Sequence, residues 1–125
     1  MDNFNGLTLA YIGDAQYELM VRKFLIDQGT RKVDNLHKTA VTFTCAEGQE
    51  KAFNIIEEYL TEQEVGIFKR GRNSKTDRKA RSASIASYRR ATGFESLFGY
   101  LYINEKVDRL NELFGIITKE MYHNA

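Results

Sequence analysis

The segment Leu9-Ala10-Tyr11-Ile12-Gly13-Asp14-Ala15-Gln16-Tyr17-Glu18-Leu19 carries the feature that decides the expected fold. Its apolar residues recur at helical rather than alternating spacing, which predicts an amphipathic helix. Followed outward, the spacing predicts a helix from about residue 6 to residue 27, with Gly29 as its stop signal. The apolar stripe of this helix consists of Leu7, Tyr11, Ala15, Leu19 and Ile26, widened by Met20, Phe24 and Leu25.

The middle of the chain repeats the helical spacing. Asp34 has the position of an N-cap for a helix that ends near Cys45. Residues 46–60 predict the next helix. Thr61 and Glu64 then match a capping box at the start of a helix that ends near residue 71.

The last third of the chain predicts two further helices. One is expected over residues 84–103, and Asn104 is expected to cap the other, over residues 105–122. With no proline in the chain, these elements predict an all-α fold, a single-domain helical bundle of about six helices over residues 1–125. The residues expected to face its core are Ala52, Phe53, Ile56, Leu60, Val65, Ile67, Phe68, Tyr88, Phe94, Leu97, Phe98, Leu101, Val107, Leu110, Leu113, Phe114 and Ile117.

The length of 125 residues is typical of one domain and is sufficient to bury a core. Cys45 is the only cysteine, so no internal disulfide can form. The sequence has no run of about 18 apolar residues, and its first residues lack the basic and apolar regions of a signal peptide. We therefore expect a soluble, cytoplasmic protein without a membrane partner.

Charge is distributed unevenly, although the formal net charge is only +1. Residues 69–90 contain nine basic residues against the single acid Asp77, a formal charge of +8, and the remainder carries −7. Residues 72–83 lack large apolar side chains, so we expect an exposed, mobile basic loop there. A basic patch on an acidic body favours a polyanionic partner. The nine basic residues are Lys69, Arg70, Arg72, Lys75, Arg78, Lys79, Arg81, Arg89 and Arg90.

Acidic residues occur in two predicted helices that are apolar on nearly all sides. Asp14 and Glu18 are one helical turn apart, and Glu95 is the only acid of residues 92–101. A carboxylate on a largely buried helix requires a partner, a proton or a metal ion. The alternative for Asp14 and Glu18 is a solvated stripe on an amphipathic helix.

Glycines in the same two helices could bring these acids together. Gly13, Gly93 and Gly99 weaken helix propensity but allow two helices to approach closely. If the helices cross near Gly13 and Gly99, Asp14 and Glu95 would face one another, and their repulsion would favour a proton or a cation between them. A site of oxygen ligands would suit Mg²⁺. The alternative partners of the two acids are the cations of Arg22, Lys23 and Arg89.

Other chemistries have weaker support. His37 and His123, the only histidines, form no HxxxH pairing, and the single ExxH spacing, from Glu120 to His123, lacks the second copy that a di-iron bundle uses, which argues against a zinc or di-iron site. Cys45 is expected to be a buried structural thiol. Neither GxxxxGK[ST] nor GxGxxG is present. Tyr88 stays open as a stacking residue, because it lies between the basic loop and Glu95 in the sequence.

Two segments resemble the motifs of the ribonuclease III family. Residues 9–19 resemble the signature helix of its catalytic domain, and Phe94-Glu95-Ser96-Leu97-Phe98-Gly99-Tyr100-Leu101-Tyr102 resembles its second acidic motif. Further shared features are Asn5-Gly6-Leu7, Asp34-Asn35-Leu36-His37-Lys38 and Lys69-Arg70-Gly71-Arg72-Asn73. Over about residues 5–115 the chain looks like the short Mini-ribonuclease III branch. That branch also lacks the separate double-stranded-RNA-binding domain, for which we expect no room here.

This resemblance implies an all-helical endonuclease domain that works as a homodimer. It implies hydrolysis of double-stranded RNA with Mg²⁺, or with Mn²⁺ in its place, to 5′-phosphate and 3′-hydroxyl ends. Asp14 and Glu95 match the family's catalytic, metal-binding acids, and Glu18 matches a supporting acid one turn on. The natural substrate implied is the double-stranded stalk of precursor 23S ribosomal RNA.

The chain departs from the longer family members at two positions. Ala10 stands where they have a glutamate and Thr92 where they have an aspartate, as is typical of the Mini branch. Two carboxylates per subunit then remain, so water, phosphate oxygens or Thr92 would complete the ligands of the metal. We expect the nine basic residues to bind RNA phosphates, with recognition resting on shape, because the major groove of A-form RNA cannot be read.

A non-catalytic RNA-binding or ribosome-assembly module on the same fold is the alternative function. Such a module would keep the basic residues without turnover, but it would have no need to keep both Asp14 and Glu95. A purely structural helical dimer is a third interpretation, which the +8 charge of residues 69–90 makes less attractive.

Overall fold

The computed structural model describes residues 4–29, 32–74 and 84–122, and within these ranges it is all-α. The helices are α1 (Gly6–Asp27), α2 (Val33–Thr44), α3 (Ala46–Ile56), α4 (Glu62–Arg72), α5 (Ile85–Ile103) and α6 (Val107–Met121), with a 3-10 helix, η1 (Glu57–Tyr59), after α3. The six α-helices of these ranges confirm the predicted fold class. None of them is long and apolar enough to cross a membrane.

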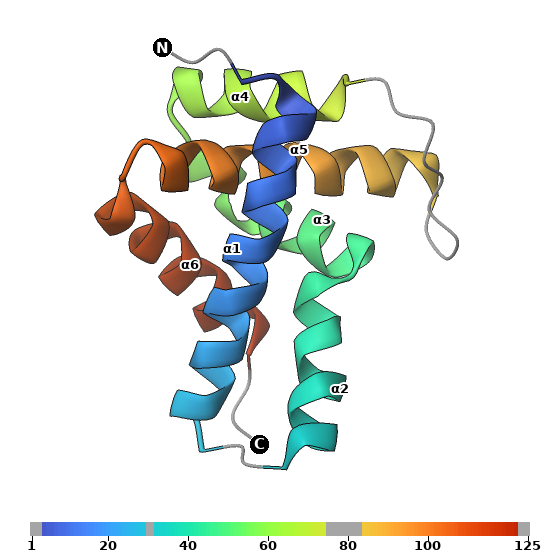
Figure 1. The fold of residues 1–125 in the computed structure, drawn as a ribbon, viewed down its shortest axis with the longest axis vertical. Helices are drawn as coiled ribbons and strands as arrows, with labels where there is room; N and C mark the ends of the chain where they lie inside the picture. Colours follow the sequence, from blue (N-terminus) through green and yellow to red (C-terminus); the bar gives the residue numbers. More distant parts are fainter. Residues whose placement is uncertain (1–3, 30–31, 75–83, 123–125) are drawn as a thin grey trace.

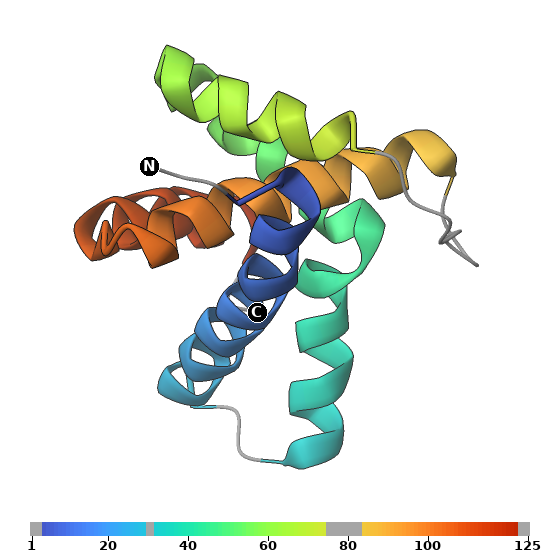
Figure 2. The same cartoon turned by 45° about the horizontal axis from the view of Figure 1, so that its top comes forward.

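Helices α1 and α5 form the centre of the fold. Figure 1 shows α1 crossing α5, while α4 lies alongside α5. Seen from the second direction, α2 stays beside α1, joined to it at the end far from α5 (Figure 2). The core lies between these helices and is rich in aromatic rings. Its largest fully buried side chains are Leu9, Tyr17, Leu25, Phe43, Phe53, Ile56, Phe94, Leu97, Phe98, Leu101, Leu110 and Leu113.

The predicted apolar stripe of α1 is wrong as a guide to its buried face. Tyr11 and Leu19, which belong to that stripe, are 83% and 65% exposed. The buried face follows Leu9, Gly13 and Tyr17, also at a spacing of four residues. Because α1 is apolar nearly all round, periodicity could not choose between its faces, and close packing through Gly13 decided it.

Two predicted helix signals are confirmed, Gly29 by its backbone conformation and the Thr61–Glu64 capping box by its hydrogen bonds. Gly29, directly after the C-cap of α1, has a φ of 100°, a left-handed conformation that glycine adopts without strain. At the start of α4, Thr61 Oγ1 accepts a hydrogen bond from the amide of Glu64 (3.1 Å). In return, Glu64 Oε1 accepts one from the amide of Thr61 (2.9 Å), which completes the capping box.

Two predicted caps are wrong. Lys32 precedes α2, so Asp34 lies in the first helical turn, where a carboxylate favours the positive end of the helix dipole. Asn104 closes α5 instead of opening α6, and its Nδ2 donates to the carbonyl of Tyr100 (2.8 Å). Because Glu105 then takes a positive φ of 57°, a helix cannot begin there, and α6 starts at Val107.

Two further expectations are modified. The helix predicted over residues 46–60 ends at Ile56 and continues as the 3-10 helix η1. Val107, expected in the core, is 54% exposed. Of the basic loop expected over residues 72–83, Arg72 is the last residue of α4, and residues 75–83 lie outside the described ranges.

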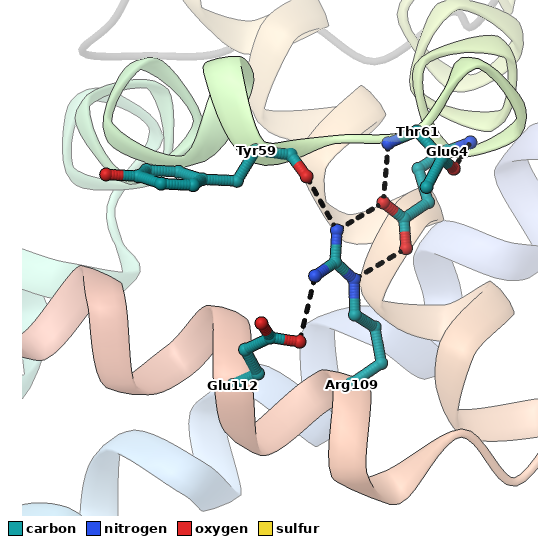
Figure 3. Close-up of polar contacts among 5 residues, drawn as sticks. All are labelled: Tyr59, Thr61, Glu64, Arg109 and Glu112. Atoms are coloured by element: carbon teal, nitrogen blue, oxygen red, sulfur yellow. Dashed lines mark hydrogen bonds and ion pairs between the residues drawn. The ribbon is translucent and has the colours of Figure 1, made fainter.

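A buried ion pair fastens α4 to α6 (Figure 3). Two nitrogens of the Arg109 guanidinium donate to the two carboxylate oxygens of Glu64, at 2.9 and 2.7 Å. Arg109 also donates to the carbonyl of Tyr59 (2.8 Å) and to Glu112 (2.9 Å). Burial opposes the charge of Glu64, but the hydrogen bonds from Arg109 and Thr61 outweigh it, and the pKa of Glu64 lies below its ordinary value.

Candidate active site

The crossing of α1 and α5 brings Asp14 and Glu95 together. A Cβ atom on Gly13 would overlap the carbonyl oxygen of Glu95 and would lie 2.7 Å from the amide nitrogen of Gly99. A Cβ atom on Gly99 would overlap the carbonyl oxygen of Leu9. The two backbones therefore touch where the sequence predicted. Asp14 directly follows Gly13, and Glu95 precedes Gly99 by about one helical turn.

A cleft of about 260 Å³ opens beside this crossing. Asp14, Thr92 and Glu95 line it together, as does Tyr88, the aromatic residue that the sequence left open. Thr92 is buried, and its hydroxyl donates to the carbonyl of Tyr88 (3.0 Å). The other residues that line the cleft are Leu7, Ala10 and Tyr11.

The two carboxyls are coupled electrostatically. Burial, followed by the charge of Asp14, raises the pKa of Glu95 from its ordinary value of 4.5 to about 8. The side-chain amide of Gln49 acts in the opposite direction by donating to Glu95 Oε2 at 3.1 Å. Glu95 thus holds a proton near neutral pH unless a cation replaces it.

These oxygens fit a hard divalent cation. No cluster of three or more His, Cys, Asp or Glu side chains occurs in the part of the chain that the structure describes. Two carboxylates are the number that Mg²⁺ takes from many proteins, with water and substrate phosphate completing its shell. Asp14 and Glu95 would be the residues that hold such an ion.

The raised pKa of Glu95 predicts a pH-dependent stability of the metal-free protein. Because the folded pKa exceeds the unfolded one, this group stabilises the fold fully below pH 4.5, and that contribution is lost between pH 4.5 and about 8. In EDTA, the Tm of Glu95→Gln protein should therefore rise relative to wild type across this window. Thermal melts at pH 5, 6.5 and 8 measure the gap. Parallel melting curves for the two proteins would contradict the assigned environment.

Glu18 lies outside the cleft. Its Oε2 accepts from Arg22 Nε at 3.1 Å, and both residues line a groove between α1 and α2. Lys23 likewise pairs along α1, with Asp27 at 2.6 Å. The alternative in which Arg22 or Lys23 neutralises Asp14, which is itself exposed, or the partly buried Glu95 is therefore not the arrangement adopted. The supporting role predicted for Glu18 stays a prediction.

Of the nine basic residues predicted to bind RNA, those that the structure describes lie at the end of α4 and in the first two turns of α5. Arg70 donates to the carbonyl of Phe4 (2.6 Å), and Arg90 pairs with Glu50 (3.3 Å). Arg72 lies over the ring of Phe68, 5.8 Å from its centre. Lys69 and Arg89 are exposed and form no ion pair within the described ranges. The predicted RNA-binding residues Lys75, Arg78, Lys79 and Arg81 lie outside those ranges.

The sequence analysis missed Gln49, which hydrogen-bonds to Glu95 from α3. A signal for it was present. Gln49 shares the helical face of Ala52, Phe53 and Ile56, all of which were expected in the core. A long polar side chain at an inward position requires a buried partner.

The protein-family model described as "Ribonuclease III domain" matches residues 7–106 of the sequence, a span that includes Asp14, Glu95 and the glycines of the helix crossing. The chain belongs to the ribonuclease III family.

Within the ribonuclease III family, the chain is similar to curated relatives named Mini-ribonuclease 3, which confirms the branch expected from the sequence. It is 42% identical to the relative from Clostridium tetani, over 94% of this chain and 78% of that protein. Identity is also 42% to the relative from Enterococcus faecalis, over 94% and 90% of the two chains. A crystal structure of a Fusobacterium nucleatum protein superposes with a TM-score of 0.87 at 29% identity, covering 95% of this chain and 97% of the other.

Proposed function

We propose that the protein is a Mg²⁺-dependent endoribonuclease that cleaves double-stranded RNA and leaves 5′-phosphate and 3′-hydroxyl ends. The observation that carries this proposal is the convergence of Asp14 and Glu95 in one cleft, at a helix crossing that only glycines permit. Membership of the ribonuclease III family supports the reaction class.

The residues of the cleft have separate tasks in this reaction. The ionised carboxylates of Asp14 and Glu95 would hold Mg²⁺, or Mn²⁺ in its place. When bound, the ion supplies Lewis-acid stabilisation of charge on the phosphate and a source of activated water. Thr92 and Tyr88 form the wall of the cleft next to the acids, and Thr92 offers its hydroxyl oxygen as a further acceptor.

The basic residues at the ends of α4 and α5 support a duplex RNA substrate. A-form RNA displays phosphates and 2′-hydroxyls across a wide minor groove, so exposed cations such as Lys69 and Arg89 can bind it without reading its sequence. We further propose, from the family resemblance, that the substrate in the cell is the stalk of precursor 23S ribosomal RNA, and that the protein works in the cytoplasm.

Two subunits would place two such clefts on one duplex, and we propose a homodimer. The stripe of α1 that includes Tyr11 and Leu19 leaves large apolar side chains in water, and an apolar groove runs between α1 and α2. Phe24, on the same helix, is partly buried and packs against Phe43 and Phe114. Sedimentation analysis of wild-type and Tyr11→Asp protein tests the assembly, with a shift from dimer to monomer expected.

Cleavage of a long double-stranded RNA by wild-type protein tests the central proposal. We expect cutting with Mg²⁺ or Mn²⁺, no cutting with EDTA, and no cutting of single-stranded RNA of the same sequence. Mapping of the ends should give 5′-phosphate and 3′-hydroxyl groups. Binding without cleavage, across several duplexes and with both metals, would support the non-catalytic RNA-binding module instead.

Salt dependence should separate the basic residues that contact RNA from those that do not. Each phosphate contact contributes nearly one unit to the slope of log K against log salt concentration, so Arg89→Gln should lower that slope by about 1. Lys23→Gln, which removes an exposed cation paired with Asp27, is the control and should leave the slope unchanged. Filter binding between about 50 and 200 mM salt measures both. Equal slopes for wild type and Arg89→Gln would exclude Arg89 from the interface.

A further inference from the structure

Gln49 lies behind the two acids, on α3, and is only 2% exposed. Its Nε2 donates to Glu95 Oε2 at 3.1 Å, which connects α3 to the acid of α5. Of the other buried polar groups of the described ranges, the hydroxyl of Tyr17 has no hydrogen-bond partner, and the rest have partners away from the two acids. Thr92, Ser96 and Thr118 hydrogen-bond to backbone carbonyls, and Glu64 pairs with Arg109.

The second polar atom of Gln49 has no partner. Its Oε1 is buried without a hydrogen bond from any described residue. A buried, unsatisfied carbonyl oxygen destabilises a fold, whereas an apolar side chain of the same shape would avoid that cost. The stability of the fold therefore gives no reason for an amide at this position, and the reason must lie in what Nε2 does to Glu95.

The backbone of α3 holds Gln49 firmly in place. A Cβ atom on the preceding residue, Gly48, would overlap the carbonyl oxygen of Thr42 and would lie 2.8 Å from that of Phe43. The end of α2 is thus pressed against the first turn of α3. That contact fixes the first turn of α3, from which the buried side chain of Gln49 extends to Glu95.

Glu95 therefore has both Gln49 and Asp14 as neighbours. Binding of a metal ion requires both carboxyls to be ionised, and the Glu95 carboxylate would then rotate away from Asp14 if nothing held it, since like charges repel. A single hydrogen bond from a fixed amide prevents that rotation and leaves Glu95 Oε1 unclaimed by Gln49. Mutation of a residue that hydrogen-bonds to a metal-binding side chain and orients it typically lowers metal affinity or activity by about 10–100-fold.

We propose that Gln49 is a positioning residue of the active site. By donating to Oε2 from the buried side, it keeps the Glu95 carboxylate turned toward Asp14, so that the pair is arranged for a divalent cation before RNA arrives. This inference rests on the proposed function and deepens it, because it assigns the orientation of a metal-binding carboxylate to a residue on a third helix, α3.

Gln49→Met tests the proposal, since methionine has a similar length and removes both polar atoms. RNA-free protein titrated with Mn²⁺ and followed by electron paramagnetic resonance should bind the ion about tenfold more weakly. In cleavage assays, kcat should fall by a similar factor with KM for RNA unchanged, because Gln49 does not reach the surface. The Tm should stay equal or rise, since the unsatisfied oxygen is gone.

The matched control is Gln63→Met. Gln63 Nε2 also donates to a side chain of α5, the hydroxyl of Tyr100 at 2.8 Å, but away from the acids. It should leave Mn²⁺ affinity and kcat unchanged. A double-mutant cycle completes the design. If Gln49 acts through Glu95, Gln49→Met should cause no further loss of Mn²⁺ affinity in a Glu95→Gln background.

The outcomes separate the inference from the function on which it rests. Gln49→Met protein that binds Mn²⁺ and cleaves RNA like wild type would overturn the inference and leave the nuclease intact. A lower Tm together with an equal further loss of affinity in the Glu95→Gln background would make Gln49 purely structural, which also overturns it. Wild-type protein that neither binds Mn²⁺ nor cleaves would overturn the proposed function itself.

Discussion

Asp14→Asn and Glu95→Gln proteins are each expected to cleave double-stranded RNA at least about a hundredfold more slowly than wild type. Each change replaces an anionic oxygen with an amide of the same size, so the cleft keeps its shape but loses half of its charged metal ligands. Metal stabilisation of a phosphate transition state amounts to several kcal/mol, and each 1.36 kcal/mol is a factor of about ten in rate. Single-turnover cleavage with saturating protein measures the loss directly.

RNA binding should survive both substitutions, because the exposed cations Lys69 and Arg89 are untouched. Glu18→Gln is the control within the same helix, since Glu18 pairs with Arg22 outside the cleft. It should change the cleavage rate by only a few-fold. Cleavage at the wild-type rate by either Asp14→Asn or Glu95→Gln would show that the cleft at the α1–α5 crossing is not the active site.

Gly13→Ala is expected to destabilise the protein by about 3 kcal/mol or more, and to remove the cleavage activity with the fold. The added methyl group would overlap the carbonyl oxygen of Glu95, so α1 and α5 would have to separate. Backbone cannot move aside as a flexible side chain does, and overpacking a well-packed contact costs about 1–3 kcal/mol, occasionally more. For a domain of this size, we expect the Tm to fall by roughly 10 °C.

A glycine-to-alanine substitution in α4 should instead stabilise the protein. Gly66 lies within α4, and nothing is within 4 Å of the position that its Cβ atom would take. Gly66→Ala should therefore stabilise the helix by about 0.5–1 kcal/mol, since alanine loses less conformational freedom on folding. Thermal melts of the two variants beside wild type form the test. A Gly13→Ala protein that melts at the wild-type temperature would be incompatible with backbones that touch at this crossing.

Much of the candidate site could be predicted from residues that are unfavourable for a helix. Gly13 and Gly99 weaken the helices that contain them, and each stands close to an acid in an apolar segment. A sequence retains such residues where backbones must approach, which is why the facing of Asp14 and Glu95 followed from local spacing. The capping box of Thr61 and Glu64 could be predicted as well, because its two residues are only three positions apart in the sequence.

Other features depended on contacts between segments far apart in the chain. Helix α1 carries two apolar stripes, and only its packing through Gly13 selected Leu9 and Tyr17 for the core over Tyr11 and Leu19. A stripe calculated from one helix contains no information on where its neighbour will lie. For the same reason, the pairing of Arg90 with Glu50 could not be read from charge alone.

The sequence by itself determined the helical class, most helix boundaries, the family and the two acids, because these depend on periodicity, capping and motifs within a few residues of each other. Only the tertiary structure decided that the partly buried Glu95 lies close to Asp14 with a raised pKa, and that Gln49 donates a hydrogen bond to it from α3. Gln49 and Glu95 are 46 positions apart. No short-range pattern links them, since their hydrogen bond exists only once α3 and α5 have packed against each other.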